Sequence, residues 1–409
     1  MVKEVEQEEV DVVKGDEVGD KMDDKFAEIW LGTHPNGPSV SALSKRPLID
    51  LIKDDLDGNL GPEGKRTQDN VGFLLKILSI GKVLSIQSHP DNDTAKRLHE
   101  SNPSVYKSPC HKPEMAVALT DFEAMVGFRP LGSLTELLHE YSEIEHIIGE
   151  EHVRALKGHM ERTRGVGDFD ISVKNAVKAV FESYMRNFPE KSGEVMSLLV
   201  ERAEEAAKTR NCPIGSLISY LNSCFPDDCG VLAPLFLNVV KLKPGESIFV
   251  PSNTPHAYIK GEIIECMALS DNVIRCGLTP KFKDVEVLCE TLSYESYLPR
   301  GEGGFKDGLT TVYRPPVDDF EVRVTDLKAG EEVTLGRGLS TPTILLVLSG
   351  RCELMVEGED SEQMQEGRFG SAFFLSYGTS VNVKAAGEGC RIVRAMNNTG
   401  GSGSRQGAR

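Results

Sequence analysis

The fold is decided by residues 244–284, PGESIFVPSNTPHAYIKGEIIECMALSDNVIRCGLTPKFKD. Short apolar runs separated by Gly, Pro and Asn predict successive β-strands here. Because side chains along a strand alternate between its faces, His256 and Tyr258 should point the same way. Glu265 follows in an apolar run, where a carboxylate is poorly solvated. A buried structural hydrogen bond and a role in an active site are both open for Glu265.

The same stretch carries a recognisable spacing of Gly, Pro and His. Gly245, Pro251 and His256 match the second cupin signature, which places an imidazole inside the mouth of a β-barrel. Farther on, Arg275 and Lys281 flank a Gly and a Pro in RCGLTPK. Paired cations suit a phosphate group, although a solvated basic turn is the alternative.

Upstream, the segment VLSIQSH (83–89) predicts a strand with one polar face. Ser85, Gln87 and His89 should project from that face. An imidazole two residues after an amide oxygen suits a divalent ion such as Zn²⁺. A solvated strand face is the alternative interpretation.

The segment HKPEMAVAL (111–119) adds a second polar cluster. If it is extended, Lys112 and Glu114 share a face, and Pro113 keeps the backbone from continuing a helix. A surface turn with a salt bridge would explain the same residues.

Composition limits the class of protein. With 409 residues, 39% of them hydrophobic, the chain is long enough for two or three core regions. The net charge of -17 argues against a nucleic-acid partner. A Walker loop and a GxGxxG motif are both absent, so the sequence does not imply a nucleotide ligand. No run is long and apolar enough for a bilayer, and the acidic start MVKEVEQEEV does not resemble a signal peptide, so we expect a cytoplasmic protein. Nine cysteines without a CxxC pair indicate reduced thiols, with a metal site at Cys224 and Cys229 as a minor alternative.

The pattern along the chain predicts a mainly β protein with a helical insertion. Short apolar runs typical of β-strands, with some helix at 69–78, are followed by apolar residues at helical spacing. Short apolar runs typical of β-strands then return. We expect two cupin-like jelly-roll β domains and an α-helical domain. The predicted boundaries are an acidic, solvated and disordered segment at 1–25, a catalytic cupin-like β domain at 26–120 and 225–300, a helical domain at 121–224, a metal-free cupin-like β domain at 301–398 and a flexible tail at 399–409.

Five motifs together resemble the type I mannose-6-phosphate isomerases in order and spacing. They are AEIWLGTHPNGPS (27–39), LSIQSHPD (84–91), HKPEMAVAL (111–119), NTPHAY (253–258) and SDNVIRCGLTPKFKDV (270–285). The resemblance implies a metal-dependent aldose-ketose isomerase that interconverts mannose 6-phosphate and fructose 6-phosphate and feeds GDP-mannose metabolism. We also expect a monomer.

The resemblance further implies roles for single residues. One Zn²⁺ per chain would be held by Gln87, His89, Glu114 and His256, with Arg275 in the active site. The remaining assignments are Lys112, Glu265 and Asp271 at the reacting end of the sugar and Ser85, Tyr258, Lys281 and His111 in substrate binding.

This chemistry needs an acid or base near two adjacent carbons and a group that stabilises an enediolate. A metal ion and Arg275 can supply the stabilisation. For the proton transfer, Lys112, Glu265 and a metal-bound water all stay open.

Two features depart from the family. Its usual Tyr-x-Trp-Gly strand is replaced by the acidic start of this chain, which leaves Trp30 as the only tryptophan. No histidine follows His256, so the last β domain should be structural. A non-catalytic sugar-phosphate-binding cupin is therefore the alternative function, and a cupin iron dioxygenase, which typically uses more than two histidines, is a third.

Overall fold

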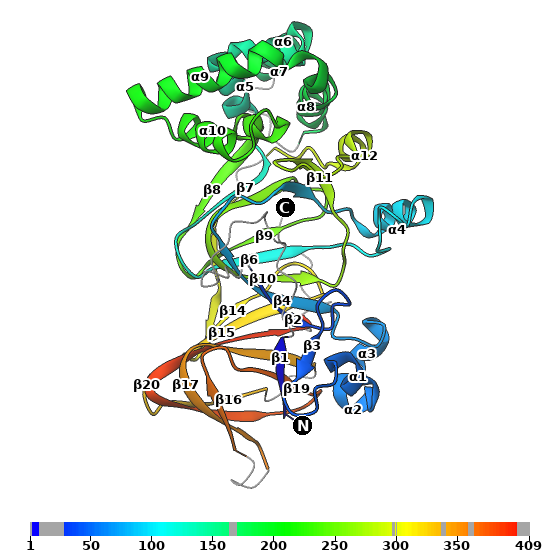
Figure 1. Cartoon of the computed structure of the whole chain (residues 1–409), viewed down its shortest axis with the longest axis vertical. Helices are drawn as coiled ribbons and strands as arrows, with labels where there is room; N and C mark the ends of the chain where they lie inside the picture. Colours follow the sequence, from blue (N-terminus) through cyan, green and yellow to red (C-terminus); the bar gives the residue numbers. More distant parts are fainter. Residues whose placement is uncertain are drawn as a thin grey trace, which may run out of the picture.

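The computed structural model describes residues 2–7, 28–162, 170–296, 299, 301–336, 341–358 and 364–398. Two antiparallel ten-stranded sheets are stacked along the long axis of the molecule, and a block of helices covers one end (Figure 1). This arrangement confirms the predicted mainly β fold with a helical insertion. Among the described residues, no helix combines the length and the apolar character needed to cross a membrane.

The central sheet carries most of the predicted site. Its strands are β2 (Glu28–Gly32), β4 (Phe73–Ile80), β5 (Ile86–Ser88), β6 (Glu114–Ala118), β7 (Phe122–Phe128), β8 (Leu237–Leu242), β9 (Glu246–Val250), β10 (His256–Ala268), β11 (Ile274–Gly277) and β12 (Glu302–Gly303). The long strand β10 pairs with β5 and β7 in its first half and with β4 and β6 in its second half. Because of this double pairing, β10 links the strands β5 and β7 to the strands β4 and β6.

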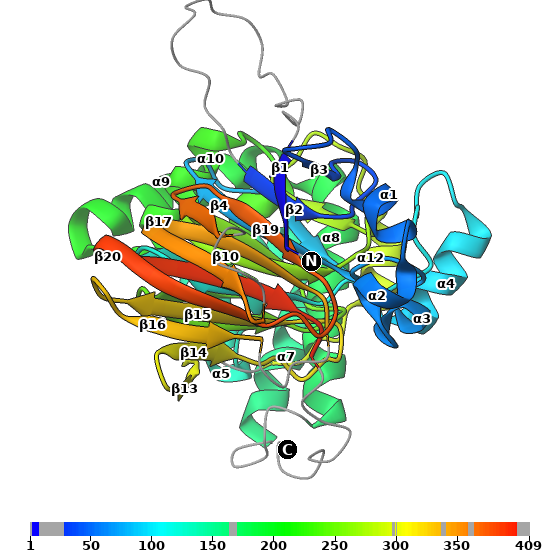
Figure 2. The same cartoon turned by 90° about the horizontal axis from the view of Figure 1, so that it is seen from below.

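The C-terminal sheet lies at the other end of the molecule. It contains β13 (Phe305–Asp307), β14 (Thr310–Tyr313), β15 (Glu321–Leu327), β16 (Glu332–Leu335), β17 (Thr343–Val356), β18 (Gln365–Arg368), β19 (Ala372–Leu375), β20 (Val381–Met396), β1 (Val2–Gln7) and β3 (Ser39–Ser41). The long strands β17 and β20 pair with each other from Thr343 opposite Met396 to Val356 opposite Val381. Figure 2 shows these two long strands curving together across the sheet.

The helices fall into two groups. Short helices follow the first strands, namely α1 (Leu48–Lys53), α2 (Leu56–Leu60), α3 (Glu63–Arg66) and α4 (Asn92–Ser101), and α12 (Val285–Thr291) follows β11. The helical block comprises α5 (Leu131–Glu140), η1 (Ser142–Ile144), α6 (Glu145–Ile148), α7 (Glu150–Arg162), α8 (Ile171–Lys191), α9 (Gly193–Arg210), α10 (Pro213–Cys224), η2 (Cys229–Leu232) and α11 (Ala233–Phe236).

Local signals explain where the longest helices begin and end. Asp170 caps α8 by accepting a hydrogen bond from the Ser172 amide. Asn211 ends α9 in the left-handed conformation, with φ of 51°, and Pro213 starts α10 where its missing N–H costs nothing. The connection between these two helices is therefore set by residues in the sequence itself.

The hydrophobic cores cross the boundaries between these parts. One core joins Met125, Phe128 and Ile274 of the central sheet to helical residues such as Phe181 and Tyr184. Another joins central and C-terminal strands, and its members include Leu31, Leu75, Ile264, Phe374 and Val393. Each β part also has a core of its own. The molecule is thus held together by shared apolar interfaces.

The structure corrects two sequence predictions. The helix predicted at 69–78 is wrong, because Phe73–Ile80 forms the buried strand β4 and the helices lie at 48–66 instead. An eight-residue apolar run fits a buried strand as well as a helix, so the spacing of its residues does not distinguish the two structures. In the predicted solvated segment 1–25, Val2–Gln7 instead forms β1, paired with β19 and β3. Backbone pairing does not require an apolar sequence, and residues 8–25 lie outside the described residues.

Candidate functional site

Three buried acceptor groups converge inside the central sheet. Nε2 of His89 lies 3.2 Å from Oε1 of Glu114, and Nε2 of His256 lies 3.2 Å from Oε2. All three residues are at most 2% exposed. Within the described ranges, these residues form the group of His, Cys, Asp and Glu that could hold a metal ion, with ligand atoms within 4.8 Å of one another.

The hydrogen bonds of the two rings fix their tautomers. Nδ1 of His89 lies 2.6 Å from the Asn272 carbonyl oxygen, and Nδ1 of His256 lies 3.0 Å from that of Thr254. Since a carbonyl oxygen can only accept, both Nδ1 atoms must donate. Burial lowers the pKa of His89 to about 4, so this ring is neutral and its Nε2 carries a lone pair.

This arrangement fits a cation. Burial favours the protonated form of Glu114, but neighbouring positive charge, including the Lys112 ammonium 3.2 Å from Oε1, holds its pKa well below the ordinary value. An ionised carboxylate that faces imidazole lone pairs is repulsive unless a positive charge lies between them. Two imidazoles and one carboxylate, each imidazole oriented by a carbonyl, are a donor set that zinc and related divalent ions prefer.

Strand pairing places Gln87 beside this group. The half-buried Gln87 is directly opposite His256 on β10 and directly opposite Arg275 on β11. Directly opposite residues of an antiparallel pair share a face of the sheet. Arg275, Gln87 and His256 therefore form one row across β11, β5 and β10.

Two further charged groups lie next to the cluster. Nζ of Lys112 is 3.2 Å from Oε1 of Glu114, which agrees with the predicted shared face of these residues. Glu265 is 4% exposed, and its Oε2 lies 3.1 Å from Nζ of Lys76. Burial raises the pKa of Glu265, and Glu114 adds to this effect while Lys76 opposes it.

Lys76 is a site residue that the sequence did not reveal. Burial opposes its charge, but the carboxylates of Glu265, Glu28 and Glu114 outweigh burial and raise its pKa. Its ammonium also lies 4.7 Å from the centre of the Trp30 ring. In the sequence, Lys76 sits inside the apolar run FLLKILSI, and only the pairing of β4 with β10 places it opposite Glu265.

Asn272 was missed as well, and it links the loops that carry the metal-binding candidates. Its backbone carbonyl accepts from His89, and its side-chain amide donates to the carbonyl oxygens of Ser108 (2.6 Å) and Cys110 (3.0 Å). Its Oδ1 accepts from the Ser108 amide at 3.3 Å. The loop before Glu114 and the side chain of His89 are therefore held by one residue. An Asn in a polar loop carries no signal for this role.

Asp271 lies beside that loop and faces a different partner. Nε2 of His34 is 3.0 Å from Oδ1 of Asp271, and Nδ2 of Asn36 donates to Oδ2 at 3.1 Å. The hydrogen bond from His34 is the main cause that lowers the pKa of Asp271. This contact brings the motif at 27–39 to the edge of the site.

The other predicted substrate-binding residues are spread around the cluster. Tyr258 is buried with its ring centre 6.0 Å from that of His256, as their shared face predicts. Ser85 lies in the segment that runs along β10, where the Leu84 amide donates to the Tyr258 carbonyl. Lys281 is exposed in the loop after β11. His111 instead points to the C-terminal part, since its Nε2 lies 3.1 Å from Oδ1 of Asp319.

Cys229 has a structural setting. Its thiol is buried and donates to the Cys276 carbonyl at 3.2 Å, and burial raises its pKa to about 12. A thiol that stays protonated is a poor metal ligand. All nine cysteines are free of disulfides.

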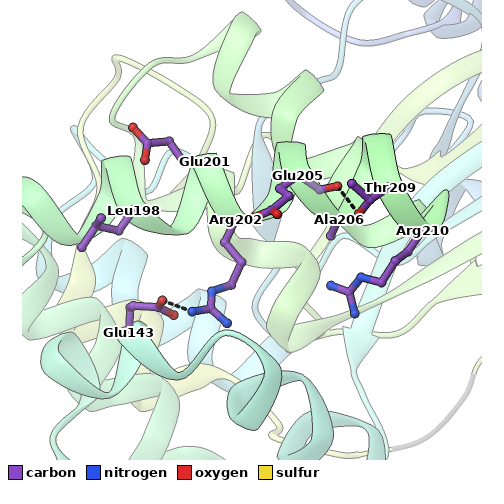
Figure 3. A pocket seen from close by; sticks show the side chains of 8 residues that line it. All are labelled: Glu143, Leu198, Glu201, Arg202, Glu205, Ala206, Thr209 and Arg210. Carbon is purple, nitrogen blue, oxygen red and sulfur yellow. Dashed lines mark hydrogen bonds and ion pairs between the residues drawn. The ribbon is translucent and has the colours of Figure 1, made fainter.

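A surface hollow on α9 is separate from the cluster. Figure 3 shows Arg202 paired with Glu143 on its wall, and Thr209 Oγ1 donates to the Glu205 carbonyl at 2.7 Å. Arg210 is paired with Glu140 at 2.8 Å. The cations of this hollow already have carboxylate partners, so it offers little binding energy to an anion.

Comparison with known proteins gives one consistent family. Sequence profiles described as phosphomannose isomerase type I match the chain at 11–131 (catalytic domain), 147–237 (helical insertion domain) and 311–359 (C-terminal). The mannose-6-phosphate isomerase of Schizosaccharomyces pombe is 36% identical over 91% of this chain and 90% of its own length. The human mannose-6-phosphate isomerase is 37% identical over 80% of this chain and 79% of its own.

Solved structures agree with the sequence comparison. The mannose 6-phosphate isomerase from Salmonella typhimurium, crystallised with fructose 6-phosphate and zinc, superposes with a TM-score of 0.75. It is 29% identical, and the match covers 91% of each chain. A mutant of the phosphomannose isomerase from the same organism gives a TM-score of 0.80 at 27% identity, covering 97% of this chain and 100% of that one.

The two antiparallel sheets and the buried His-Glu-His group define a cupin protein with a candidate metal centre. Within that class, the chain belongs to the type I phosphomannose isomerase family of enzymes.

Proposed function

We propose that this chain interconverts D-mannose 6-phosphate and D-fructose 6-phosphate and holds one zinc ion per chain. The observation that carries the proposal is the buried group of His89, Glu114 and His256, whose lone pairs face one another in a chain that is 36% identical to a mannose-6-phosphate isomerase. Gln87 is the proposed fourth ligand, supported by its pairing opposite His256.

The proposed reaction moves a proton between C2 and C1 of the open-chain sugar through an enediolate. A zinc ion at this position would act as a Lewis acid on the sugar oxygens. Arg275 would add positive charge where the enediolate forms, which is supported by its place in the row with Gln87 and His256.

Lys112 and Glu265 are the proposed groups for proton transfer. Lys112 contacts Glu114, and the raised pKa of Glu265 brings this carboxyl closer to neutral pH, where it can both accept and donate a proton. Lys76 would hold the Glu265 carboxylate in position through their ion pair. Asp271 and Tyr258 would border the reacting carbons, and Ser85, Lys281 and His111 are proposed for the rest of the sugar phosphate.

We also propose the predicted division of the chain into a catalytic β domain (26–120 and 225–300), a helical domain (121–224) and a C-terminal β domain (301–398). The positions of the family profiles support this division. A cytoplasmic location is supported by the free thiols. The link to GDP-mannose metabolism and the monomeric state stay predictions.

The test is a coupled assay of the purified full chain with mannose 6-phosphate. Chelation should abolish turnover, and added Zn²⁺ should restore it. Activity that survives complete metal removal would reject the metal-dependent mechanism. Binding of mannose 6-phosphate without any turnover would favour the sugar-phosphate-binding alternative.

An iron dioxygenase is the other alternative. A cupin iron dioxygenase typically uses more than two histidines, whereas the group here has His89 and His256, although two histidines and one carboxylate can also bind iron. The family membership and the proposed cations Arg275 and Lys281 favour the isomerase. Oxygen consumption with Fe²⁺ in place of Zn²⁺ is the measurement that would favour the oxygenase.

His256→Ala tests the ligand set itself. Loss of a buried imidazole from the group should release the metal from the purified protein. The readout is the zinc content per chain after dialysis, with Lys281→Ala as the control that keeps all proposed ligands. A His256→Ala protein with one tightly held zinc per chain would remove this residue from the site.

A further inference from the structure

An unbalanced group of arginines lies in the C-terminal sheet, outside the site described above. Arg314 follows β14, Arg323 lies on β15 and Arg394 lies on β20. Arg323 and Arg394 are directly opposite each other in the pairing of β15 with β20. Opposite like charges on adjacent strands repel and are destabilising unless something compensates them.

Within the described part of the chain, Glu321 is the carboxylate paired with this group, and it is already in use. Glu321, which is 2% exposed, accepts from Nε of Arg314 with Oε2 at 2.7 Å. Its Oε1 accepts from Nε of Arg323 at 2.6 Å. Both oxygens of Glu321 therefore serve the two outer arginines.

Arg394 is left without compensation at its Nε. This residue is 3% exposed, and its buried Nε has no hydrogen-bond partner among the described residues. Burial and the neighbouring Arg323 lower the pKa of Arg394 to about 9, against the opposing effects of Glu321 and Asp307. A buried guanidinium with an unmade hydrogen bond is costly to the fold and points to a missing partner.

One member of the group is partly exposed, and Arg394 lies on the face of the C-terminal sheet that carries that sheet's own core. The exposed fraction of the side chain falls from 33% at Arg314 to 13% at Arg323, and Arg394 is 3% exposed. Arg394 is directly opposite Leu345, which belongs to the core on the inner face of the C-terminal sheet. In a cupin-type β-barrel, this is the face that encloses ligands.

We propose that Arg314, Arg323 and Arg394 form a binding site for a small oxyanion of the size of phosphate or sulfate. Planar guanidiniums match the oxygens of such an anion and can each donate two hydrogen bonds. An oxyanion beside Glu321 would supply the acceptor that the Nε of Arg394 lacks. The C-terminal sheet, which lacks histidine ligands, would thus keep a ligand site of different chemistry.

The test is equilibrium dialysis of the full chain with labelled inorganic phosphate, compared with Arg394→Met. Methionine keeps the apolar stem of the side chain and removes the charge. We expect the number of bound phosphates per chain to fall by one, or the affinity at one site to fall about tenfold or more. Arg391→Met is the matched control, because Arg391 lies on the same strand and pairs with the exposed Asp326.

A second measurement covers the case in which Arg394→Met does not fold. Arg314→Met changes a partly exposed residue of the same group and should weaken the same phosphate site severalfold. Phosphate should also raise the melting temperature of the wild type and of Arg391→Met above that in chloride at equal ionic strength, but not that of Arg394→Met. Wild-type phosphate stoichiometry and affinity in both Arg314→Met and Arg394→Met would overturn the proposal. Phosphate bound at the proposed active site would affect all these proteins equally, so it does not interfere.

Discussion

At the scale of single residues, the candidate site depends on which nitrogen of each histidine carries the proton. Carbonyl oxygens at Asn272 and Thr254 hold the protons on Nδ1, and both Nε2 atoms are thereby turned toward Glu114. A metal ligand that is held in this way loses little freedom on binding. The residues that orient the ligands should therefore matter for metal affinity as well as the ligands do.

Asn272→Ala tests this orientation. The variant removes the side-chain bonds to Ser108 and Cys110 that hold the carbonyl facing His89. We expect the affinity for zinc to fall about 10- to 100-fold, measured by competition with a chromogenic chelator. Asn397→Ala is the control, because Asn397 also holds two carbonyls through its buried amide, those of Val71 and Asp319. Equal zinc affinity in Asn272→Ala and Asn397→Ala would show that Asn272 has only a structural role.

Arg275→Ala tests the proposed charge contact. Arg275 is not among the proposed metal ligands, so the zinc content should stay at one per chain. The turnover number should fall by about two orders of magnitude or more, since a contact to developing negative charge is lost. Arg186 of α8 is paired with Glu286 of α12, and Arg186→Ala should keep both the zinc content and the turnover number of the wild type. A kcat for Arg275→Ala close to that of the wild type would refute the assignment.

At the scale of elements, α9 and α10 approach each other closely at one glycine. A Cβ on Gly215 would lie 2.4 Å from the Ala203 carbonyl oxygen, and this atom belongs to the backbone of α9. Alanine favours a helix over glycine by only about 1 kcal/mol. The overlap with backbone atoms forces the helices apart, so packing outweighs propensity here.

Gly215→Ala and Gly132→Ala form a matched pair that tests this balance. Gly215→Ala should lower the free energy of unfolding by about 1–3 kcal/mol. Gly132→Ala in α5, where a Cβ meets nothing within 4 Å, should raise it by about 0.5–1 kcal/mol. Urea denaturation of both variants gives the two signs, and a stabilised Gly215→Ala would contradict the close approach.

At the scale of the whole molecule, the sheets and the helical block share their cores. Leu75 and Ile264 of the central sheet pack in one core with Phe374 and Val393 of the C-terminal sheet. Separation of the parts would expose this apolar surface to water. The predicted domains should therefore not behave as independent folding units.

Calorimetry of the full chain checks this expectation. A single unfolding transition should be observed, and Phe320→Ala, which empties a fully buried position in the shared core, should lower its midpoint. A chain that ends before residue 301 should aggregate, because Leu31, Leu75 and Ile264 lose their cover. Two well-separated transitions, with Phe320→Ala moving only one of them, would contradict the shared core.

The sequence by itself determined the local features and the family. Apolar periodicity predicted the β-strands and the helical block, and the resemblance to the type I mannose-6-phosphate isomerases implied Gln87, His89, Glu114 and His256 as metal ligands. These features can be read locally, because strand alternation, helix spacing and ligand chemistry depend on residues close together in the chain. The misassigned run at 73–80 marks the limit, since its apolar residues suit both a strand and a helix.

Only the tertiary structure decided which distant residues meet. The pairing of β4 with β10 sets Lys76 against Glu265, and loop packing makes Asn272 the support of His89. The opposition of Arg323 and Arg394 likewise follows from the register of β15 with β20. Strand order and register arise from the packing of the whole chain, and no local pattern of residues contains them.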